Sequence, residues 1–276
     1  MKFKAVMYES LSMKNLSFLG NTLNKLTKNC VLRLTKAEMS FLVCEENSSP
    51  KQISLWCFID ARQYFNEFIV EAMGPTCEIF LEFPTDMFSS SLSSLKTGNS
   101  SPRSVKIKLT NKVSPCLTVD IDLVSDIGMS RTCVHDIPVK VLPRLLWSEY
   151  NDPPSHNYNI IIELKNLKKV RSVVERLKKL CSYVELKPSN DGLLSVSGST
   201  QTVTVNTIFK NVLLIEAAGD AESNVRVDAK KLYSLLCCEV LNPKKISCSF
   251  LESKLVHFIL YCDLFMVHFY LTTIEE

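Results

Sequence analysis

The stretch K-N-L-K-K-V-R-S-V-V-E-R-L-K-K-L, residues 165–180, places apolar residues at steps of three and four and cations at most of the positions between them. This spacing predicts an amphipathic helix over residues 165–181. On a wheel of about 100° per residue, one arc is apolar and consists of Leu167, Val170, Val173, Val174, Leu177, Leu180 and Cys181. The opposite arc is cationic and consists of Lys165, Lys168, Lys169, Arg171, Arg176, Lys178 and Lys179. The helix should therefore pack on one side and present positive charge on the other.

The charge of this stretch is unusual for the chain, whose formal net charge is only +3. Its only carboxylate is Glu175, so the residues outside it are net negative. Like charges three or four residues apart on a helix repel one another, and a bound polyanion would relieve that repulsion. We therefore interpret the cationic arc as a surface for phosphates; the alternative is a solvated lysine face with no ligand.

A second amphipathic helix is predicted near the start of the chain, over residues 10–29. Its apolar stripe consists of Leu16, Leu19, Leu23, Leu26 and Cys30, and its cations Lys14, Lys25 and Lys28 lie opposite that stripe. Two shorter helices are predicted over residues 85–96, with Thr85 as the N-cap, and 229–241. Their cations, Lys96, Lys230 and Lys231, extend the same pattern.

The chain has two halves with the same order of elements: strand, long helix, strands, short helix, three strands. V-H-D-I-P-V-K-V at 134–141 matches V-H-F-Y-L-T-T-I at 267–274 in this repeat. Residues 143–157, with N-D-P-P-S-H, form the best linker. We predict an α+β protein with domains at 1–142 and 158–276. Pro138 cannot donate to a strand ladder, which places the strand at 133–142 on a sheet edge.

Several functional classes find no support in the sequence. The 11 cysteines include no Cys-x-x-Cys pair, and the N-terminus has no apolar leader, so we expect a reducing compartment and no metal. The apolar segment 255–274 contains His257, Asp263 and His268, which favours two buried strands over a membrane span. Motifs for phosphate loops, zinc proteases and serine hydrolases are missing, so we expect no enzyme and no cofactor. Histidines within strand patterns, His257 and His268 among them, are expected to be buried structural residues.

Several motifs resemble the Hus subunit family of the nine-one-one DNA-damage checkpoint clamp. They are M-K-F-K-A, S-L-W-C, Y-F-N-E-F, I-K-L-T-N-K-x-x-P-C-L-T-V, V-H-D-I-P-V-K-V-L-P-R-x-L-W, S-V-V-E-R-L-K-K-L and L-N-P-K-K. Residues 85–103 and 210–224 match poorly. The resemblance implies a PCNA-like sliding-clamp fold, in which each of two repeated domains places two helices on a curved antiparallel sheet.

The resemblance also implies how such a chain works. The family forms a heterotrimer with two related checkpoint clamp subunits, is placed by a clamp loader, encircles double-stranded DNA without regard to sequence, and recruits repair enzymes during the cell-cycle checkpoint. We therefore expect a nuclear protein, with a cytoplasmic pool, that binds no membrane. The alternatives are a replication-type homotrimeric clamp and a scaffold that binds only protein.

Two further sets of residues follow from the resemblance. The subunit interface is expected at the edge strands, with Val134, Asp136, Pro138, Lys140, Leu194 and Val196. A pocket for partner peptides is expected beside the linker, with Leu142, Leu145, Leu146 and Trp147. The alternative for this second set is that the side chains only hold the linker on the sheet.

Overall fold

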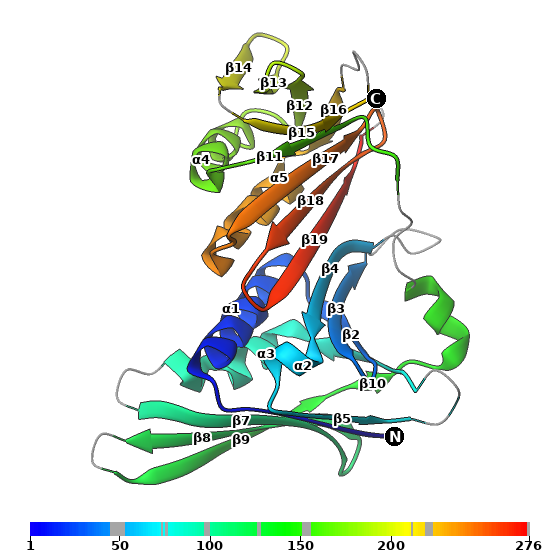
Figure 1. The fold of residues 1–276 in the computed structure, drawn as a ribbon, viewed down its shortest axis with the longest axis vertical. Helices are drawn as coiled ribbons and strands as arrows, with labels where there is room; N and C mark the ends of the chain where they lie inside the picture. Colours follow the sequence, from blue (N-terminus) through cyan, green and yellow to red (C-terminus); the bar gives the residue numbers. More distant parts are fainter. Residues whose placement is uncertain are drawn as a thin grey trace. The chain divides into compact units, whose positions relative to one another are not determined.

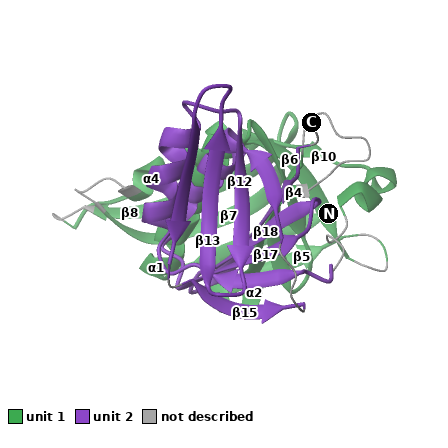
Figure 2. Cartoon of the chain, turned by 90° about the horizontal axis from the view of Figure 1, so that it is seen from above, with its two compact units in different colours: residues 1–151 green, residues 152–276 purple. Residues whose placement is uncertain are grey.

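A computed structural model describes residues 1–44, 53–72, 74, 77–96, 100–125, 128–150, 156–210, 212–218 and 223–274. The chain divides into two compact units, Met1–Asn151 and Asp152–Glu276 (Figure 2). This division lies within the segment 143–157 that the sequence predicts as a linker. No helix in the described residues has the length and hydropathy that a membrane crossing needs.

Unit 1 contains two antiparallel sheets and two principal helices (Figure 1). Its elements are β1 (Lys2–Met7), α1 (Ser10–Leu26), β2 (Asn29–Leu34), β3 (Glu38–Cys44), β4 (Ile53–Asp60), α2 (Ala61–Tyr64), β5 (Glu67–Glu71), β6 (Ile79–Pro84), α3 (Thr85–Ser91), the 3-10 helix η1 (Ser93–Lys96), β7 (Ser100–Asn111), β8 (Pro115–Ser125), β9 (Ser130–Pro138), β10 (Lys140–Val141) and the 3-10 helix η2 (Arg144–Tyr150). One sheet has the strand order β5-β1-β7-β8-β9, and the other strands follow the order β10-β6-β2-β3-β4.

Unit 2 is built in the same way. Its elements are β11 (Ile160–Glu163), α4 (Leu167–Leu177), β12 (Tyr183–Ser189), β13 (Leu193–Ser199), β14 (Thr204–Phe209), β15 (Leu213–Ala217), β16 (Val225–Asp228), α5 (Ala229–Leu236), the 3-10 helix η3 (Cys237–Leu241), β17 (Lys245–Leu251), β18 (Leu255–Tyr261) and β19 (Phe265–Thr272). The strand orders are β15-β11-β17-β18-β19 and β14-β13-β12-β16.

The two units have matching topology. Strands β1, β5, β7, β8 and β9 of unit 1 correspond to β11, β15, β17, β18 and β19 of unit 2. Their order in the sheet, β5-β1-β7-β8-β9, is the same as the order β15-β11-β17-β18-β19 in unit 2. The same correspondence relates the order β6-β2-β3-β4 to the order β16-β12-β13-β14. The predicted internal repeat is therefore confirmed, and the matched segments 134–141 and 267–274 begin in the equivalent strands β9 and β19. Strand β9 ends its sheet, as Pro138 predicts.

The long helices form where the sequence predicts them. In α1, the apolar stripe residues Leu16, Leu19 and Leu23 are fully buried, and in α4 the buried residues are Leu167, Val170, Val174 and Leu177. Each long helix lies against the short helix of its own unit, α1 against α3 and α4 against α5. Burial of these apolar faces, at roughly 25 cal/mol per Å², holds the helices on the sheets.

Two predicted details of the helices are wrong. Thr85 is the first residue of α3 and not its N-cap; its hydroxyl instead donates to the carbonyl oxygen of Lys28 at 3.1 Å, which ties α3 to the end of α1. Leu180 is 57% exposed and does not belong to the buried arc, because α4 ends at Leu177 and the chain turns there.

Gly198 permits the close approach of α4 to strand β13. A Cβ atom at position 198 would lie 2.6 Å from Sγ of Cys181 and 3.1 Å from Cδ2 of the buried Leu177. We expect Gly198→Val to lower the free energy of unfolding by about 1–3 kcal/mol, because the larger side chain overpacks this contact. Urea denaturation would measure the change. The neighbouring Ser199→Val should stay within about 0.5 kcal/mol of the parent chain, since Ser199 is exposed; equal losses in both variants would contradict the explanation.

Candidate nucleic-acid interface

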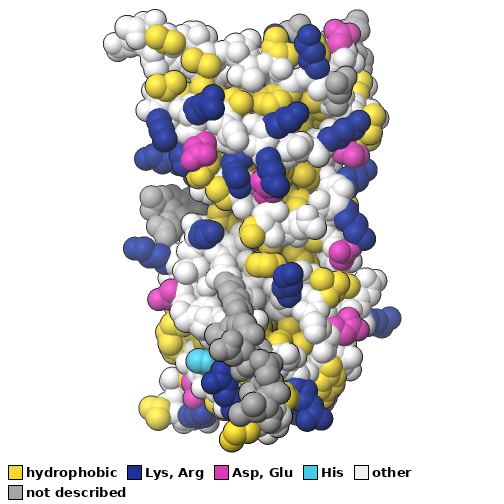
Figure 3. All heavy atoms as spheres, turned by 90° about the vertical axis from the view of Figure 1, so that its left-hand side faces the viewer, with side chains coloured by type: hydrophobic (Ala, Val, Ile, Leu, Met, Phe, Trp, Pro, Cys, Tyr) yellow, Lys and Arg dark blue, Asp and Glu magenta, His cyan; other side chains and the backbone are white. Residues whose placement is uncertain are grey.

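The side of α4 that faces away from the sheet carries the densest group of cations. The helix starts at Asn166, whose side chain accepts a hydrogen bond from the Lys169 backbone N–H at 3.3 Å. Lys165, Lys168, Lys169, Arg176 and Lys179 are exposed, and Arg171 and Lys178 are partly exposed. The predicted segregation of apolar and cationic faces is therefore present. On the face shown in Figure 3, Lys and Arg side chains outnumber those of Asp and Glu.

Part of this charge is compensated by a residue that the sequence analysis missed. Glu239 of η3, whose side chain is only 17% exposed, lies 3.4 Å from Nζ of Lys168 and 3.1 Å from a guanidinium nitrogen of Arg171. Lys178 is also engaged, with its Nζ 3.0 Å from the centre of the Tyr233 ring. Glu239 lies far from α4 in the sequence, so no pattern within 165–180 could reveal it.

Four cations of this surface remain available to a ligand. In the described part of the chain, no carboxylate lies within ion-pair distance of Lys165, Lys169, Arg176 or Lys179. We call these four residues the α4 cation cluster. Exposed ammonium and guanidinium groups donate hydrogen bonds and accept none, so the cluster can bind phosphate oxygens without first breaking an ion pair.

The remaining predicted cations lie on or beside the other helices. Lys14, Lys25 and Lys28 are exposed at α1, and Nζ of Lys14 lies 5.7 Å from the Phe18 ring. Lys230 and Lys231 open α5, where their backbone N–H groups both donate to Asp228 at 2.8 Å. Lys96 ends η1, and its side chain lies outside the described part of the structure. Each unit thus has a helical surface on which lysines gather.

Comparison with known proteins identifies the family. The model of the family described as "Hus1-like protein" matches residues 1–275. The chain belongs to the Hus1-like protein family. It is 34% identical to human "Checkpoint protein HUS1" over 268 residues, covering 94% of each chain. It is 33% identical to Drosophila melanogaster "Checkpoint protein Hus1-like" over 234 residues, covering 84% of each.

Solved structures show the fold of this Hus1-like chain. PCNA from Thermococcus kodakaraensis superimposes with a TM-score of 0.71 at 12% identity, covering 98% of this chain and 99% of the other. The Entamoeba histolytica protein gives a TM-score of 0.72 at 11% identity, with 99% of both chains covered. The predicted α+β sliding-clamp fold is confirmed. Together, the checkpoint names of the relatives and the PCNA-like fold support a role as a checkpoint clamp subunit.

Of the four residues predicted to line a peptide pocket, one lies in the core of unit 1 of the Hus1-like chain and two pack against that core. Leu142 is buried, and Leu146 and Trp147 pack against the same apolar cluster, whose other members are Val31, Leu42, Trp56, Phe80 and Tyr150. The indole N–H of Trp147 donates to the Leu142 carbonyl at 3.0 Å, and its ring lies 4.9 Å from that of Phe80. Only Leu145 is exposed, at 88%. These contacts hold η2 on the sheet, as the alternative predicts, and the peptide pocket stays a prediction.

The predicted interface residues separate into two groups. Val134, Asp136 and Pro138 are exposed on the edge strand β9, and Lys140 is exposed on β10. Asp136 accepts hydrogen bonds from Lys112 and Thr118, which lower the pKa of its carboxyl group.

Leu194 and Val196 require a correction. They are buried on β13, which pairs with β12 on one side and β14 on the other. The edge of this sheet is β14, because the hairpin after β13 adds one further strand.

Two of the three histidines of unit 2, His257 and His268, form a hydrogen-bonded chain with Tyr158. The Tyr158 hydroxyl lies 2.8 Å from Nδ1 of His257, and Nε2 of His257 lies 3.0 Å from Nδ1 of His268. Burial, with the neighbouring His268 and His156 imidazoles, lowers the pKa of His257 to about 3, and burial lowers the pKa of His268. Neutral rings satisfy every contact if Tyr158 donates to His257 and His257 donates to His268. Among the described residues, no group of three or more His, Cys, Asp or Glu side chains could hold a metal ion.

Proposed function

We propose that the chain is a non-catalytic subunit of a heterotrimeric clamp that encircles duplex DNA, with the helices of both units directed at the phosphates. The α4 cation cluster is the observation that carries this proposal, because its four charges have no counterion in the described residues. Lysine and arginine contacts with phosphates ignore base sequence and weaken with salt. A ring that slides on DNA and is retained by its closed shape needs contacts of this kind.

Assembly of that ring would use the edge strands. Strands β9 and β14 each end a sheet, so each offers backbone N–H and C=O groups to a strand from another subunit. We propose that the two related checkpoint clamp subunits pair with these edges. A clamp loader would place the ring on DNA in the nucleus, and repair enzymes would bind its outer side, where Leu145 is a contact point.

Co-purification tests the assembly. Expressed with the two related subunits, the chain should elute as a complex of one copy of each, and expressed alone it should form no stable ring of three. Sedimentation equilibrium would measure both masses. A stable homotrimer of this chain would favour the replication-type clamp, and a complex whose retention on duplex DNA does not vary with salt would favour the scaffold that binds only protein.

A further inference from the structure

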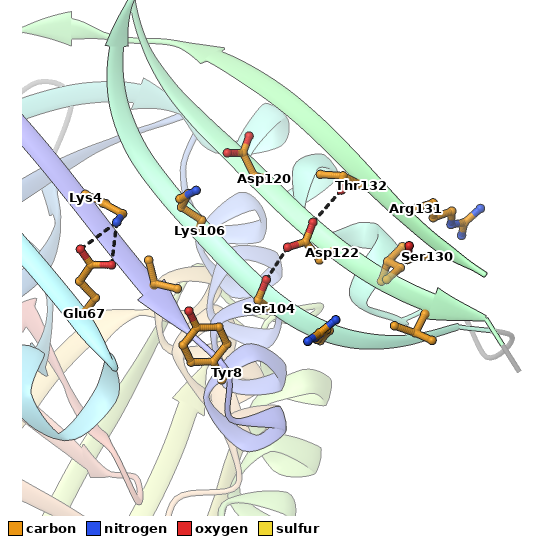
Figure 4. Close-up of a pocket in the computed structure, with 14 residues that line it drawn as sticks. Lys4, Tyr8, Glu67, Ser104, Lys106, Asp120, Asp122, Ser130, Arg131 and Thr132 are labelled. Carbon is orange, nitrogen blue, oxygen red and sulfur yellow. Dashed lines mark hydrogen bonds and ion pairs between the residues drawn. The ribbon is translucent and has the colours of Figure 1, made fainter. Parts of the chain in front are cut away.

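A polar groove lies on the face of the five-stranded sheet of unit 1 that is opposite α1 (Figure 4). Its volume is about 550 Å³, within the range of small-ligand and peptide sites. Strands β1, β5, β7, β8 and β9 all contribute to it. On β7 the side chains alternate, so that Val105 and Ile107 are buried toward the core while Lys106 lines the groove.

The carboxylates of the groove are already satisfied by the chain itself. Glu67 accepts from Lys4 at 2.7 and 2.8 Å, and Asp120 accepts from Lys108 at 2.9 Å. Asp122 accepts from the hydroxyl groups of Thr132 and Ser104, both at 2.7 Å. These two hydrogen bonds lower the pKa of the Asp122 carboxyl group. Each of the three carboxylates therefore already has a hydrogen-bond donor within the chain.

Three of the four cations that line the groove are not satisfied in the same way. Arg103, Lys106 and Arg131 have no hydrogen-bond or ion-pair partner within the described residues, although each lines the groove. Arg103 is the extra residue of a β-bulge, because Pro102 pairs with Leu123 and Ser104 with Asp122. Bulges redirect side chains and are frequent next to functional sites. Asp122 interacts electrostatically with Lys106 and Arg103, but no acceptor of the groove is within hydrogen-bond distance of these three cations in the described residues.

We propose that this groove binds an acidic peptide segment of a partner protein, with Arg103, Lys106 and Arg131 contacting its carboxylate or phosphoryl groups. The carboxylate or phosphoryl oxygens of such a ligand would accept hydrogen bonds from these three side chains. Hydrogen bonds between charged groups are about twice as strong as neutral ones. A peptide fits better than nucleic acid because Glu67, Asp120 and Asp122 stand among the cations. A peptide can carry its acidic groups only where they meet the cations, whereas a nucleic acid carries a phosphate at every nucleotide and could not avoid these carboxylates. The nearby, partly exposed side chain of Val124 can contact the peptide's own apolar groups.

Fluorescence anisotropy with the full chain tests this site. The probes are a labelled Asp/Glu-rich peptide, the same peptide with phosphoserine in place of the acids, an Asn/Gln counterpart and a single-stranded oligonucleotide. The variant Arg103→Ser/Lys106→Ser/Arg131→Ser should weaken binding of an acidic peptide about tenfold or more. The two acidic probes distinguish a carboxylate from a phosphoryl ligand.

A matched control removes the same charge elsewhere. Lys36, Arg62 and Lys254 are exposed and lie outside the groove, so their joint replacement with Ser should leave peptide binding within about twofold of the parent chain. Equal losses in both triple variants would show only a net-charge effect and would overturn the site. Unchanged binding in the groove variant, equal binding of the Asn/Gln peptide, or oligonucleotide binding that depends on the groove more than peptide binding does would also overturn it.

Discussion

Replacing Lys165, Lys169, Arg176 and Lys179 with glutamate is expected to shorten the lifetime of the assembled clamp on linear duplex DNA at least tenfold and to flatten its dependence on salt. Each lost phosphate contact should reduce the slope of log affinity against log salt concentration by about one unit. The fold should survive, because these four side chains are exposed and have no ion-pair partner in the described residues. Dissociation rates measured over a series of NaCl concentrations would give both quantities.

The choice of these four residues follows from the contacts of the others. Lys168 and Arg171 lie beside Glu239, and Lys178 lies over Tyr233, so replacing them would also disturb unit 2. The charge-matched control reverses the exposed residues Lys2, Lys36, Arg62 and Lys254. If the cluster variant keeps the normal lifetime and salt slope, or if the control loses as much, α4 does not face DNA.

Unit 2 is expected to lose stability steeply in mild acid. The pKa of His257 is about 3 in the folded chain and 6.5 in the unfolded chain, so between these values only the unfolded state takes up the proton. Stability is therefore intact above pH 6.5 and falls as the pH falls, by about 2 kcal/mol at pH 5 from His257 alone. A loss of that size lowers the melting temperature by about 4–8 °C. Thermal denaturation from pH 7.5 to pH 5 would measure it.

Substitution of His257 identifies the source of this acid sensitivity. His257→Phe keeps a ring between His268 and Tyr270, whose ring centre lies 4.3 Å away, but cannot take up a proton. It should lower stability at pH 7.5, because Tyr158 and His268 lose a hydrogen-bond partner. It should also remove most of the decline toward pH 5, leaving the smaller part due to His268. His135→Gln, on β9 in unit 1, is the control and should keep the decline; an unchanged decline in His257→Phe would refute this origin.

Local periodicity was sufficient for most of the fold. Both long helices can be predicted from their apolar stripes, Leu16, Leu19 and Leu23 in α1 and Val170, Val174 and Leu177 in α4. Residues at steps of three and four lie on one side of a helix, so that side must face the core if the stripe is to be buried. Strand β15 was missed, since Leu213 and Ile215 are exposed at a sheet edge and show no alternation of buried and exposed residues. The helix η2 falls within the segment that the sequence predicts as a linker, because N-D-P-P follows it. The side chains that hold η2 in place pack against strands that are distant in the sequence, so local patterns could not predict it.

The candidate sites also have some features that the sequence predicts and others that depend on contacts between distant residues. The cationic face of α4 can be read from sixteen consecutive residues, but which of its charges are compensated depends on Glu239, brought close only by folding. The packing of Leu142, Leu146 and Trp147 depends on a cluster that includes Phe80 and Trp56 of other strands. The groove at Arg103, Lys106 and Arg131 joins strands from both ends of unit 1, so no spacing of residues could predict it.

The sequence alone determined that the chain is a twofold repeat of helix-bearing sheets with a segregated cationic face, because side-chain period and charge order are properties of neighbouring residues. Only the tertiary structure decided that β14 and not β13 ends its sheet, which lysines remain without a counterion in the described residues, and where a groove opens. Those properties depend on pairs of residues far apart in the chain, whose distances are set by strand order and not by sequence spacing.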